Sequence, residues 1–369
     1  MVMNKFDRLH DAINSKKTIL CVGPISKYCI DSVIELANEN QIPMVLIASR
    51  RQVECRKLGE GYVFGTESFV NYVRKRDTGG WVYLARDHGG PWQGNKEEKI
   101  DYSKAMQNAL ISYENDIKYG IDIIHIDPSL KSRPISEIIS DVNVLYSYCE
   151  AYAKSYGKEI IYEAGTEEHG GHITEPSDFE NFVKNIKDVS PKIKFVVGNV
   201  GLYVKERKNT GMLNQTRAEK LVKICNQNNL YLKCHNVDYV NSHQNNGIVW
   251  RLNQLGVHAI NIAPEIGVQE TETLLYTWRS HGYFEEAEKF IELAYKSGKW
   301  FKWMTNKGDV KSKEERAIIA GHYIFNYWAV EEMRKYINKK EGGNIEERVK
   351  FMIMSNIRDY LMNLNWEVK

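Results

Sequence analysis

The sequence lacks the features of membrane-spanning, secreted and nucleic-acid-binding proteins. No apolar run in its 369 residues approaches the roughly 18 residues that are needed to cross a bilayer. The N-terminal segment is charged and has no apolar core, so we expect no secretory signal. Because 50 basic and 48 acidic residues leave a net charge of only +2, we expect neither nucleic acid nor a membrane surface as a partner.

Cysteine pairs at metal-binding or redox spacing are also absent. None of the six cysteines belongs to a C-x-x-C pair, and two of them, Cys21 and Cys234, lie in apolar runs typical of strands. This usage indicates buried thiols in a reducing compartment and no disulfide framework. We therefore predict a cytoplasmic protein.

Several short motifs that define enzyme classes are missing. The chain has no G-x-x-x-x-G-K-[ST] loop, which argues against a P-loop kinase. No G-x-G-x-x-G follows the first apolar run, so a dinucleotide cofactor is not indicated. Neither a G-x-S-x-G elbow nor an H-E-x-x-H helix occurs.

What the chain does contain is a repeated alternation of apolar strand-like runs and amphipathic helical patterns. The runs span residues 18–23, 44–49, 81–88, 121–127, 159–163, 194–199, 230–235 and 259–263. Their starts are on average about 34 residues apart, which suits a strand–helix unit. Eight such units predict a closed (β/α)₈ TIM barrel. An open doubly wound sheet, with its ligand at one switch point, is the alternative.

The remainder of the chain is helical in pattern and rich in aromatic residues. We predict a barrel with an N-terminal helix over residues 1–269 and a helical C-terminal extension over residues 270–369. The extension is expected to pack on the barrel, and part of it to serve an oligomer interface.

Polar side chains follow most of the predicted strands. The strand at 81–88 ends in Asp87 and His88, a carboxylate beside an imidazole. The other strand ends supply Ser49, Arg51, Gln52, Asp127, Glu163, Glu167, Asn199, His235, Asp238, Asn261 and Glu265. Because the chemistry of such barrels lies at the C-terminal ends of the strands, we expect these groups to converge.

A histidine or a carboxylate stands at five of these ends, in His88, Asp127, Glu163, His235 and Glu265. Uncompensated charges gathered in one place are costly, and a divalent cation compensates them. Imidazole with carboxylate suits zinc or a similar metal. A hydrogen-bonded polar ring without a metal is the alternative.

Four further histidines are weighed for the same site. His125 alternates with Asp127 and could face the same mouth, but we favour a structural histidine inside the barrel. His258 and His281 are interpreted as structural or surface residues. His322 could reach the mouth from the extension, although a structural role is again favoured.

Short motifs in this order resemble one known family. They are R-D-H-G-G-P-W-Q at 86–93, H-I-D-P-S at 125–129, G-T-E at 165–167 with G-G at 170–171, H-N-V-D-Y at 235–239, and Q-V at 52–53 with G-Y at 61–62. The chain thereby resembles the tagatose-1,6-bisphosphate aldolase accessory-subunit family, a relative of class II, zinc-dependent ketose-bisphosphate aldolases. The resemblance extends from about residue 20 to residue 275.

The resemblance implies roles for individual residues. Asp87 would carry the proton of the substrate's C4 hydroxyl, and His88 and His235 would bind a divalent metal, Zn²⁺ above all. The family's middle metal histidine, expected near residues 201–203, is missing. A glutamate from the fifth strand, Glu163 or Glu167, is expected to replace it, and we assign Glu163 as the ligand and Glu167 to a catalytic role.

The remaining polar groups at the strand ends are expected to contact the substrate. These are Ser49, Arg51, Gln52, Asp127, Asn199, Asp238, Asn261 and Glu265. Arg51 is the natural partner of an anionic group.

The resemblance implies aldol cleavage or condensation of a ketose or ketose phosphate. Two alternatives stay open. One is a sugar C4-epimerase that breaks and re-forms the same bond, and the other is a non-catalytic subunit that stabilises a partner class II aldolase. The expected partners are a small sugar or sugar phosphate, further copies of the chain and, in the last case, the catalytic subunit.

Overall fold

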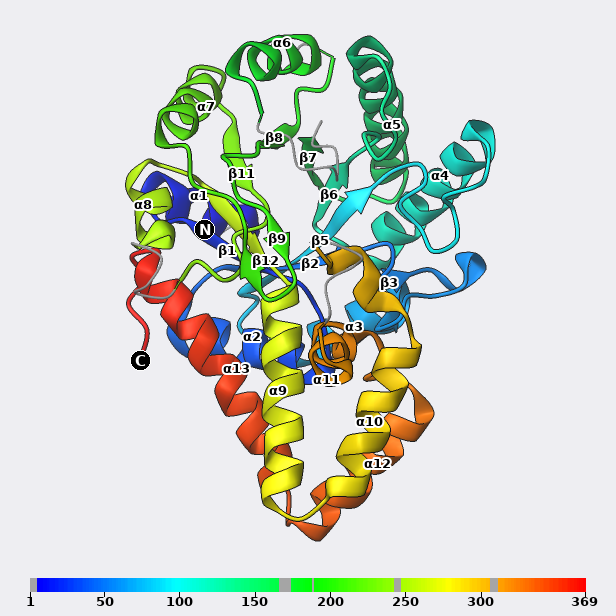
Figure 1. Ribbon diagram of the computed structural model, residues 1–369. Helices are drawn as coiled ribbons and strands as arrows, with labels where there is room; N and C mark the ends of the chain where they lie inside the picture. Colours follow the sequence, from blue (N-terminus) through cyan, green and yellow to red (C-terminus); the bar gives the residue numbers. More distant parts are fainter. Residues whose placement is uncertain (1–4, 166–173, 188, 242–246, 306–310) are drawn as a thin grey trace.

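Eight parallel strands close into a barrel in the computed structural model, which describes residues 5–165, 174–187, 189–241, 247–305 and 311–369 (Figure 1). The barrel strands are β1 (Ile19–Val22), β2 (Met44–Ser49), β5 (Val82–Gly89), β6 (Ile123–Ile126), β7 (Ile161–Gly165), β8 (Ile193–Val197), β11 (Tyr231–Cys234) and β12 (Ala259–Ile262). They follow one another around the barrel in chain order, and β1 closes it by pairing with both β12 and β2. The predicted (β/α)₈ barrel is confirmed, and the open sheet is wrong.

Helices surround the barrel and connect its strands. They are α2 (Lys27–Asn40), α3 (Thr66–Arg76), α4 (Tyr102–Tyr119), α5 (Ile135–Ser155), α6 (Pro176–Lys187), α7 (Gln215–Gln227) and α8 (Ile248–Gln254). Local signals fix several of their ends. Asp101 caps α4 by accepting a hydrogen bond from the amide of Lys104, and the left-handed Gly120 (φ 102°) ends the same helix.

The N-terminal helix α1 (Lys5–Asn14) closes the end of the barrel at which the strands begin. Its buried residues Phe6, Leu9 and Ile13 join a cluster of inward-facing strand side chains. That cluster contains Ile19, Cys21, Val45, Ile47, Tyr83, Ala85, Ile123, Ile161, Phe195 and Ala259. The barrel interior is thus filled at this end, and any ligand must enter from the opposite end, where the strands terminate.

Two pairs of very short strands lie in the loops at that opposite end. β3 (Val53–Glu54) pairs with β4 (Phe64–Gly65), with the 3₁₀ turn η1 (Arg56–Leu58) between them. β9 (Val204–Lys205) and β10 (Lys208–Asn209) form a hairpin after β8. These elements were not predicted, because strands of two residues leave no periodic pattern.

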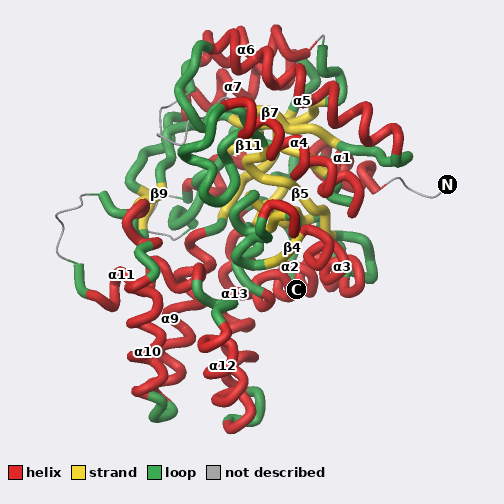
Figure 2. The backbone as a smooth tube through the Cα atoms, turned by 90° about the vertical axis from the view of Figure 1, so that its right-hand side faces the viewer, coloured by secondary structure: helices red, strands yellow, loops and turns green. Residues whose placement is uncertain are grey.

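The last third of the chain is helical, as predicted. It comprises α9 (Pro264–Ser280), α10 (Phe284–Lys296), η3 (Lys299–Trp303), α11 (Lys313–Ala320), η4 (Gly321–Tyr323), α12 (Trp328–Lys340) and α13 (Asn344–Asn363). Figure 2 shows α9, α10 and α12 projecting away from the barrel, while α13 packs on α2 and α9. The expected boundary at residue 269 falls within α9, and the division into two domains stays a prediction.

A buried ion-pair network joins this extension to the barrel. Arg334 of α12 binds Glu270 of α9 and Glu346 of α13, and Glu270 accepts a hydrogen bond from Ser26 at the start of α2.

All six cysteines are buried and unpaired. Among the described residues, no helix is both long and apolar enough to span a membrane.

Candidate metal centre

The inward-facing side chains of the barrel change from apolar to polar toward the C-terminal ends of the strands. Since side chains alternate between the two faces of a strand, the residue two positions after a core residue also faces inward. The pairs are Ala85 and Asp87, Ile123 and His125, Ile161 and Glu163, and Ala259 and Asn261. Strand alternation therefore places a set of polar groups directly above the apolar layer.

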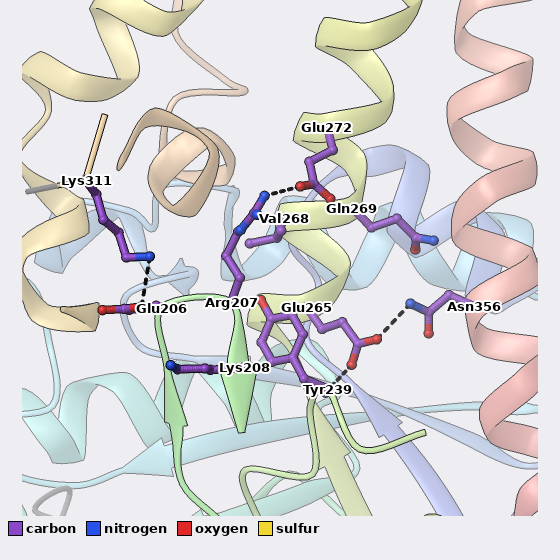
Figure 3. Close-up of a pocket in the computed structure, with 10 residues that line it drawn as sticks. All are labelled: Glu206, Arg207, Lys208, Tyr239, Glu265, Val268, Gln269, Glu272, Lys311 and Asn356. Atoms are coloured by element: carbon purple, nitrogen blue, oxygen red, sulfur yellow. Dashed lines mark hydrogen bonds and ion pairs between the residues drawn. The ribbon is translucent and has the colours of Figure 1, made fainter. Parts of the chain in front are cut away.

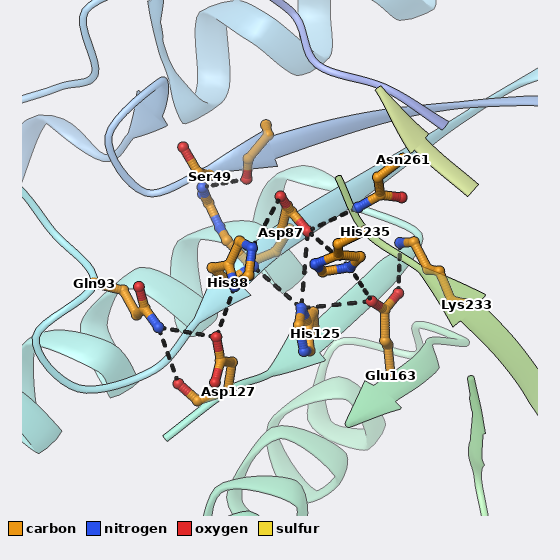
Figure 4. A network of polar contacts seen from close by, with 12 residues as sticks. Ser49, Asp87, His88, Gln93, His125, Asp127, Glu163, Lys233, His235 and Asn261 are labelled. Atoms are coloured by element: carbon orange, nitrogen blue, oxygen red, sulfur yellow. Dashed lines mark hydrogen bonds and ion pairs between the residues drawn. The ribbon is translucent and has the colours of Figure 1, made fainter. Parts of the chain in front are cut away.

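Four polar side chains at this end of the barrel could hold one metal ion. Asp87, His125, Glu163 and His235 each offer a ligand atom, and these atoms all lie within 4.8 Å of one another. Glu163 Oε1 lies 3.5 Å from His125 Nδ1 and 3.6 Å from His235 Nε2. Asp87 Oδ1 lies 3.8 Å from His125 Nδ1 and 3.9 Å from His235 Nε2. Figure 4 shows the four side chains pointing toward one another.

This geometry fits a small divalent cation. Two ligand atoms bound at about 2.1 Å to the same zinc ion can be at most about 4.2 Å apart, and the four separations above satisfy that limit. His125 Nε2 and Glu163 Oε1 are buried and make no hydrogen bond to the residues that the structure describes. Buried polar atoms normally have a partner, and a cation would supply one for the Glu163 oxygen.

Lys233 balances part of the negative charge of the group. Its ammonium is buried and lies 2.7 Å from Glu163 Oε2, which leaves Oε1 facing the two histidines. Burial alone would raise the pKa of Glu163, but Lys233, His125 and His235 outweigh it and lower the pKa to about 2. Burial would likewise lower the pKa of Lys233, and Glu163 raises it above its ordinary value. Both groups are therefore charged at neutral pH.

Asp87 is the most solvent-accessible member of the group. Its side chain is 12% exposed, against 1–5% for the other three. Burial would raise its pKa, but His88, His125 and His235 hold the pKa of Asp87 well below its ordinary value. Asn261 donates a long hydrogen bond, 3.4 Å, to Asp87 Oδ1. Oδ2 therefore remains the oxygen closer to His88, at 3.8 Å from its Nε2.

His88, predicted as a metal ligand, is oriented differently from His125. Its Nδ1 lies 2.7 Å from Asp127 Oδ2. Asp127 is fixed in turn by Gln93 and by both the hydroxyl and the amide of Ser129. The backbone of His88 is left-handed (φ 43°), and the pairing of β5 with β6 shifts register at this point. The irregular backbone directs the ring toward Asp127.

His125 is the member of the group that sequence analysis passed over. The sequence-based prediction for this residue is a structural role, which the geometry contradicts. The missed signal is its position two residues after Ile123, which faces the core. Lys233 was not predicted either. It lies two residues before His235, and strand alternation places the two side chains on the same face.

The predicted substrate contacts on β2 and its loop lie at the same rim. Ser49 is in register with Asp87 on the neighbouring strand, and its amide and hydroxyl both donate to Gln52 Oε1. Arg51 is one-third exposed and lies 3.5 Å from the exposed Glu98. Their roles toward a substrate stay predictions.

Other predicted contacts have structural partners. Asp238 Oδ1 accepts hydrogen bonds from the amides of Ala263 and Glu265, where α9 begins. Glu265 is bound by Tyr239, Asn356 and Tyr360. Burial and Glu265 raise the pKa of Asp238 to about 8. These two carboxylates stand apart from the four-residue group and organise the junction between barrel and extension.

Glu265 also lines a cavity of about 500 Å³ between the β9–β10 hairpin and the extension (Figure 3). Charges in its wall are largely paired, Arg207 with Glu272 and Lys311 with Glu206. This cavity adjoins Tyr239 and contains no member of the four-residue group. We therefore do not identify it with the reaction centre.

The remaining predicted residues are placed as follows. Asn199 is buried, and its Oδ1 accepts a hydrogen bond from the amide of Gly201. Glu167 lies outside the described residues. His258 Nδ1 accepts from the amide of Leu232, and His281 pairs with Glu341 at the surface, which agrees with their interpretation as structural and surface residues. His322 is buried beside Gly267 of α9.

Comparison with known proteins supports the fold. No model of a protein family matches the chain, and no curated protein matches it in sequence. A crystal structure of a probable tagatose 6 phosphate kinase from Sinorhizobium meliloti 1021 superposes with a TM-score of 0.76 at 16% identity, over 94% of this chain and 100% of that one. Fructose-bisphosphate aldolase from Campylobacter jejuni superposes with a TM-score of 0.57 at 13% identity, over 97% of this chain and 93% of that one. Both likenesses concern the barrel fold.

Proposed function

We propose that this chain is a metal-dependent enzyme of carbohydrate metabolism that cleaves or forms a carbon–carbon bond in a ketose or ketose phosphate. The observation that carries the proposal is the meeting of His125, Glu163, His235 and Asp87 within 4.8 Å at the open end of the barrel. The fold likeness to an aldolase agrees with it.

His125, Glu163 and His235 would hold the metal. Two imidazoles and one carboxylate form a ligand set of catalytic zinc sites, which keep a further position open for substrate. Zinc is therefore the metal we expect. When bound there, a divalent cation would act as a Lewis acid and stabilise negative charge on the ketose oxygens.

Asp87 is the proposed proton carrier. Its carboxylate lies on the solvent side of the ligand group, with Oδ1 held by Asn261 and Oδ2 directed toward His88. In the cleavage direction it takes the proton of the C4 hydroxyl, the C4 oxygen becomes a carbonyl oxygen, and the electron pair of the C3–C4 bond moves to C3. In the condensation direction Asp87 returns that proton.

His88 is the proposed second proton-handling group. The Asp127 carboxylate accepts a hydrogen bond from Nδ1–H, which leaves Nε2 facing Asp87 as the nitrogen that can exchange a proton. Substrate would pack against this ring, whose side chain is 21% exposed. Here the proposal departs from the sequence-based prediction, in which His88 was a ligand.

The state of Lys233 favours metal-dependent chemistry over an imine mechanism. An aldolase that forms an imine with its substrate needs a neutral lysine amine as the nucleophile. Lys233 contacts the four-residue group through Glu163. It is buried, and its pKa is raised, so its amine stays protonated. Its ammonium is thus suited to fix Glu163.

Two further functions are compatible with the same residues. Re-forming the cleaved bond on the opposite face of the carbonyl would invert C4, which is epimerisation. A subunit that stabilises a partner aldolase would not require the proton-handling pair of Asp87 and His88. We place the enzyme ahead of the subunit for that reason, and an oligomeric state stays a prediction.

The experiment is incubation of the purified chain with ketoses and ketose phosphates, with and without a chelator, and with borohydride in a separate sample. Metal-dependent aldol cleavage yields two shorter carbonyl products, is abolished by the chelator and resists borohydride. An isomeric sugar as the product identifies the epimerase. A stabilising subunit is identified if the pure chain is inactive and a second barrel protein that co-purifies with it is active only in its presence.

A further inference from the structure

The helical extension returns to the barrel at the rim that lies next to the candidate metal centre. Asn326 donates hydrogen bonds from its side-chain amide to the carbonyl oxygens of Tyr62 and Val63, which lie in the loop after β2. The Tyr62 ring packs 5.0 Å from that of Tyr323 in η4. Residues from the extension are thus fixed against the loop that carries Arg51.

This contact brings Lys302 of η3 to the same place. Its Nζ lies 5.1 Å from the ring centre of Tyr323 and 4.7 Å from that of Trp303. Trp303 in turn donates its indole N–H to the Tyr323 hydroxyl at 3.2 Å. The aromatic rings therefore hold the ammonium in a defined position.

Tyr62 links the two cations, because its ring packs against Tyr323, over which Lys302 lies, and its amide donates a hydrogen bond to the backbone oxygen of Arg51. Among the described residues, no acidic side chain forms an ion pair with Lys302, and Arg51 has only the exposed Glu98 at 3.5 Å. The Lys302 side chain is exposed to solvent, and its ammonium lies over the rings of Trp303 and Tyr323. Burial and then the charge of Arg51 lower its pKa to about 7. Aromatic contacts stabilise one cation, but they do not explain why a second one lies nearby.

The position of Arg51 connects this pair to the reaction centre. Ser49 is in register with Asp87 on the neighbouring strand, and Arg51 follows Ser49 by two residues. The backbone oxygen of Arg51 accepts a hydrogen bond from the amide of Tyr62. The two cations therefore stand at the rim of the barrel on the side of Asp87.

We propose that Arg51 and Lys302 form an anion-binding subsite, which holds a phosphate or carboxylate at one end of the substrate. The proposal rests on the function proposed above and makes the substrate an acidic sugar derivative. Guanidinium and ammonium groups supply charge-assisted hydrogen bonds to either anion. One of the two cations comes from the barrel and the other from the extension, so the extension completes the site.

The test measures anion binding to the full chain after removal of metal by a chelator, so that a missing metal site cannot mask the result. Isothermal titration with inorganic phosphate is expected to show binding to the wild type, weakened at least about tenfold in Lys302→Gln and in Arg51→Gln, as expected for loss of one charged hydrogen bond. Lys302→Arg should retain binding. Lys296→Gln, which removes an exposed lysine of α10 that pairs with Glu292, is the matched control and should bind as the wild type does.

Fructose 6-phosphate, fructuronate and fructose then separate the sources of the anion. If fructose 6-phosphate binds more tightly than fructose, and Lys302→Gln removes the difference in affinity, the subsite binds phosphate. The same result with fructuronate shows that it binds carboxylate. Equal phosphate affinity in wild type and Lys302→Gln would overturn the proposal, as would equal affinity for all three sugars. Thermal unfolding midpoints near that of the wild type show that the variants fold.

The failure of this inference is distinguishable from failure of the proposed function. If the metal binds and the anions do not, the subsite is rejected and the metal centre stands. If phosphate binds as expected and no metal does, the function is rejected and the anion subsite stands.

Discussion

The His88 imidazole and the Asp127 carboxylate form a close pair, with 2.7 Å between Nδ1 and Oδ2. The adjacent residue Asp87 points into the group that includes His125, so two neighbouring residues of one strand end in different surroundings. This arrangement separates metal binding from proton handling.

Replacing His88 should impair the reaction and spare the metal. We expect His88→Gln to lower kcat by about 100-fold, a typical loss when a positioned acid–base group is removed. The metal content, measured by elemental analysis, should equal that of the wild type. Loss of metal from His88→Gln would instead support the sequence-based assignment of His88 as a ligand.

Asp87 should be essential for turnover. Asp87→Asn keeps the size of the side chain and its acceptor for Asn261 but cannot take a proton, so we expect a fall in kcat of at least about 100-fold. Steady-state kinetics with the cleaved ketose measure it. As a control, Asp238→Asn alters a buried carboxylate outside the group and should keep most of the activity. A kcat of Asp87→Asn within a few-fold of the wild type would remove this residue from the mechanism.

The buried pair of Lys233 and Glu163 should be costly to break. Lys233→Met leaves the Glu163 charge unpaired in the interior, and we expect a loss of about 3–5 kcal/mol in the free energy of unfolding. Adding Glu163→Gln should recover part of that loss, since the double variant leaves no uncompensated charge. Denaturant titration measures both. Additive losses in the double variant would show that the two groups are not coupled.

Acid should destabilise the fold through His258. Burial lowers its pKa from 6.5 to about 4, so the folded protein keeps this ring neutral where the unfolded chain protonates it. The stability contributed by the neutral ring is complete above pH 6.5 and is lost as the pH falls toward 4, by about 1–3 kcal/mol.

Unfolding midpoints measured between pH 4 and 7 test this expectation with a matched pair of variants. His258→Asn can keep an acceptor for the Leu232 amide, and its unfolding midpoint should lose the pH dependence that protonation of His258 causes. His281→Asn, at an exposed position, should keep the wild-type slope. Identical slopes in all three proteins would contradict the assignment.

The barrel was predictable from the sequence because its signals are local and repeated. Runs such as 44–48 are apolar throughout, as strands covered on both faces require, and a helical pattern separates each run from the next. The site was predictable only in part. Strand alternation counted from Ile123 and Ile161 would have placed both His125 and Glu163 inside the mouth, whereas counting residues at strand ends found only Glu163.

Other features depend on contacts that no local pattern records. His88 turns toward Asp127 because β5 shifts register and the backbone becomes left-handed there. Lys302 lies at the same rim as Arg51, some 250 residues away along the chain, only because Tyr323 of η4 packs against Tyr62. Predicting such placements requires the tertiary packing itself.

The most direct test of the account is the metal content of the purified chain after dialysis against one equivalent of zinc. We predict about one zinc per chain in the wild type and in His88→Gln, and loss of most of it in His125→Ala and His235→Ala, because both rings face Glu163 at 3.5–3.6 Å. Wild-type zinc content in His125→Ala and His235→Ala, with both proteins folded, would contradict the metal centre and the function built on it.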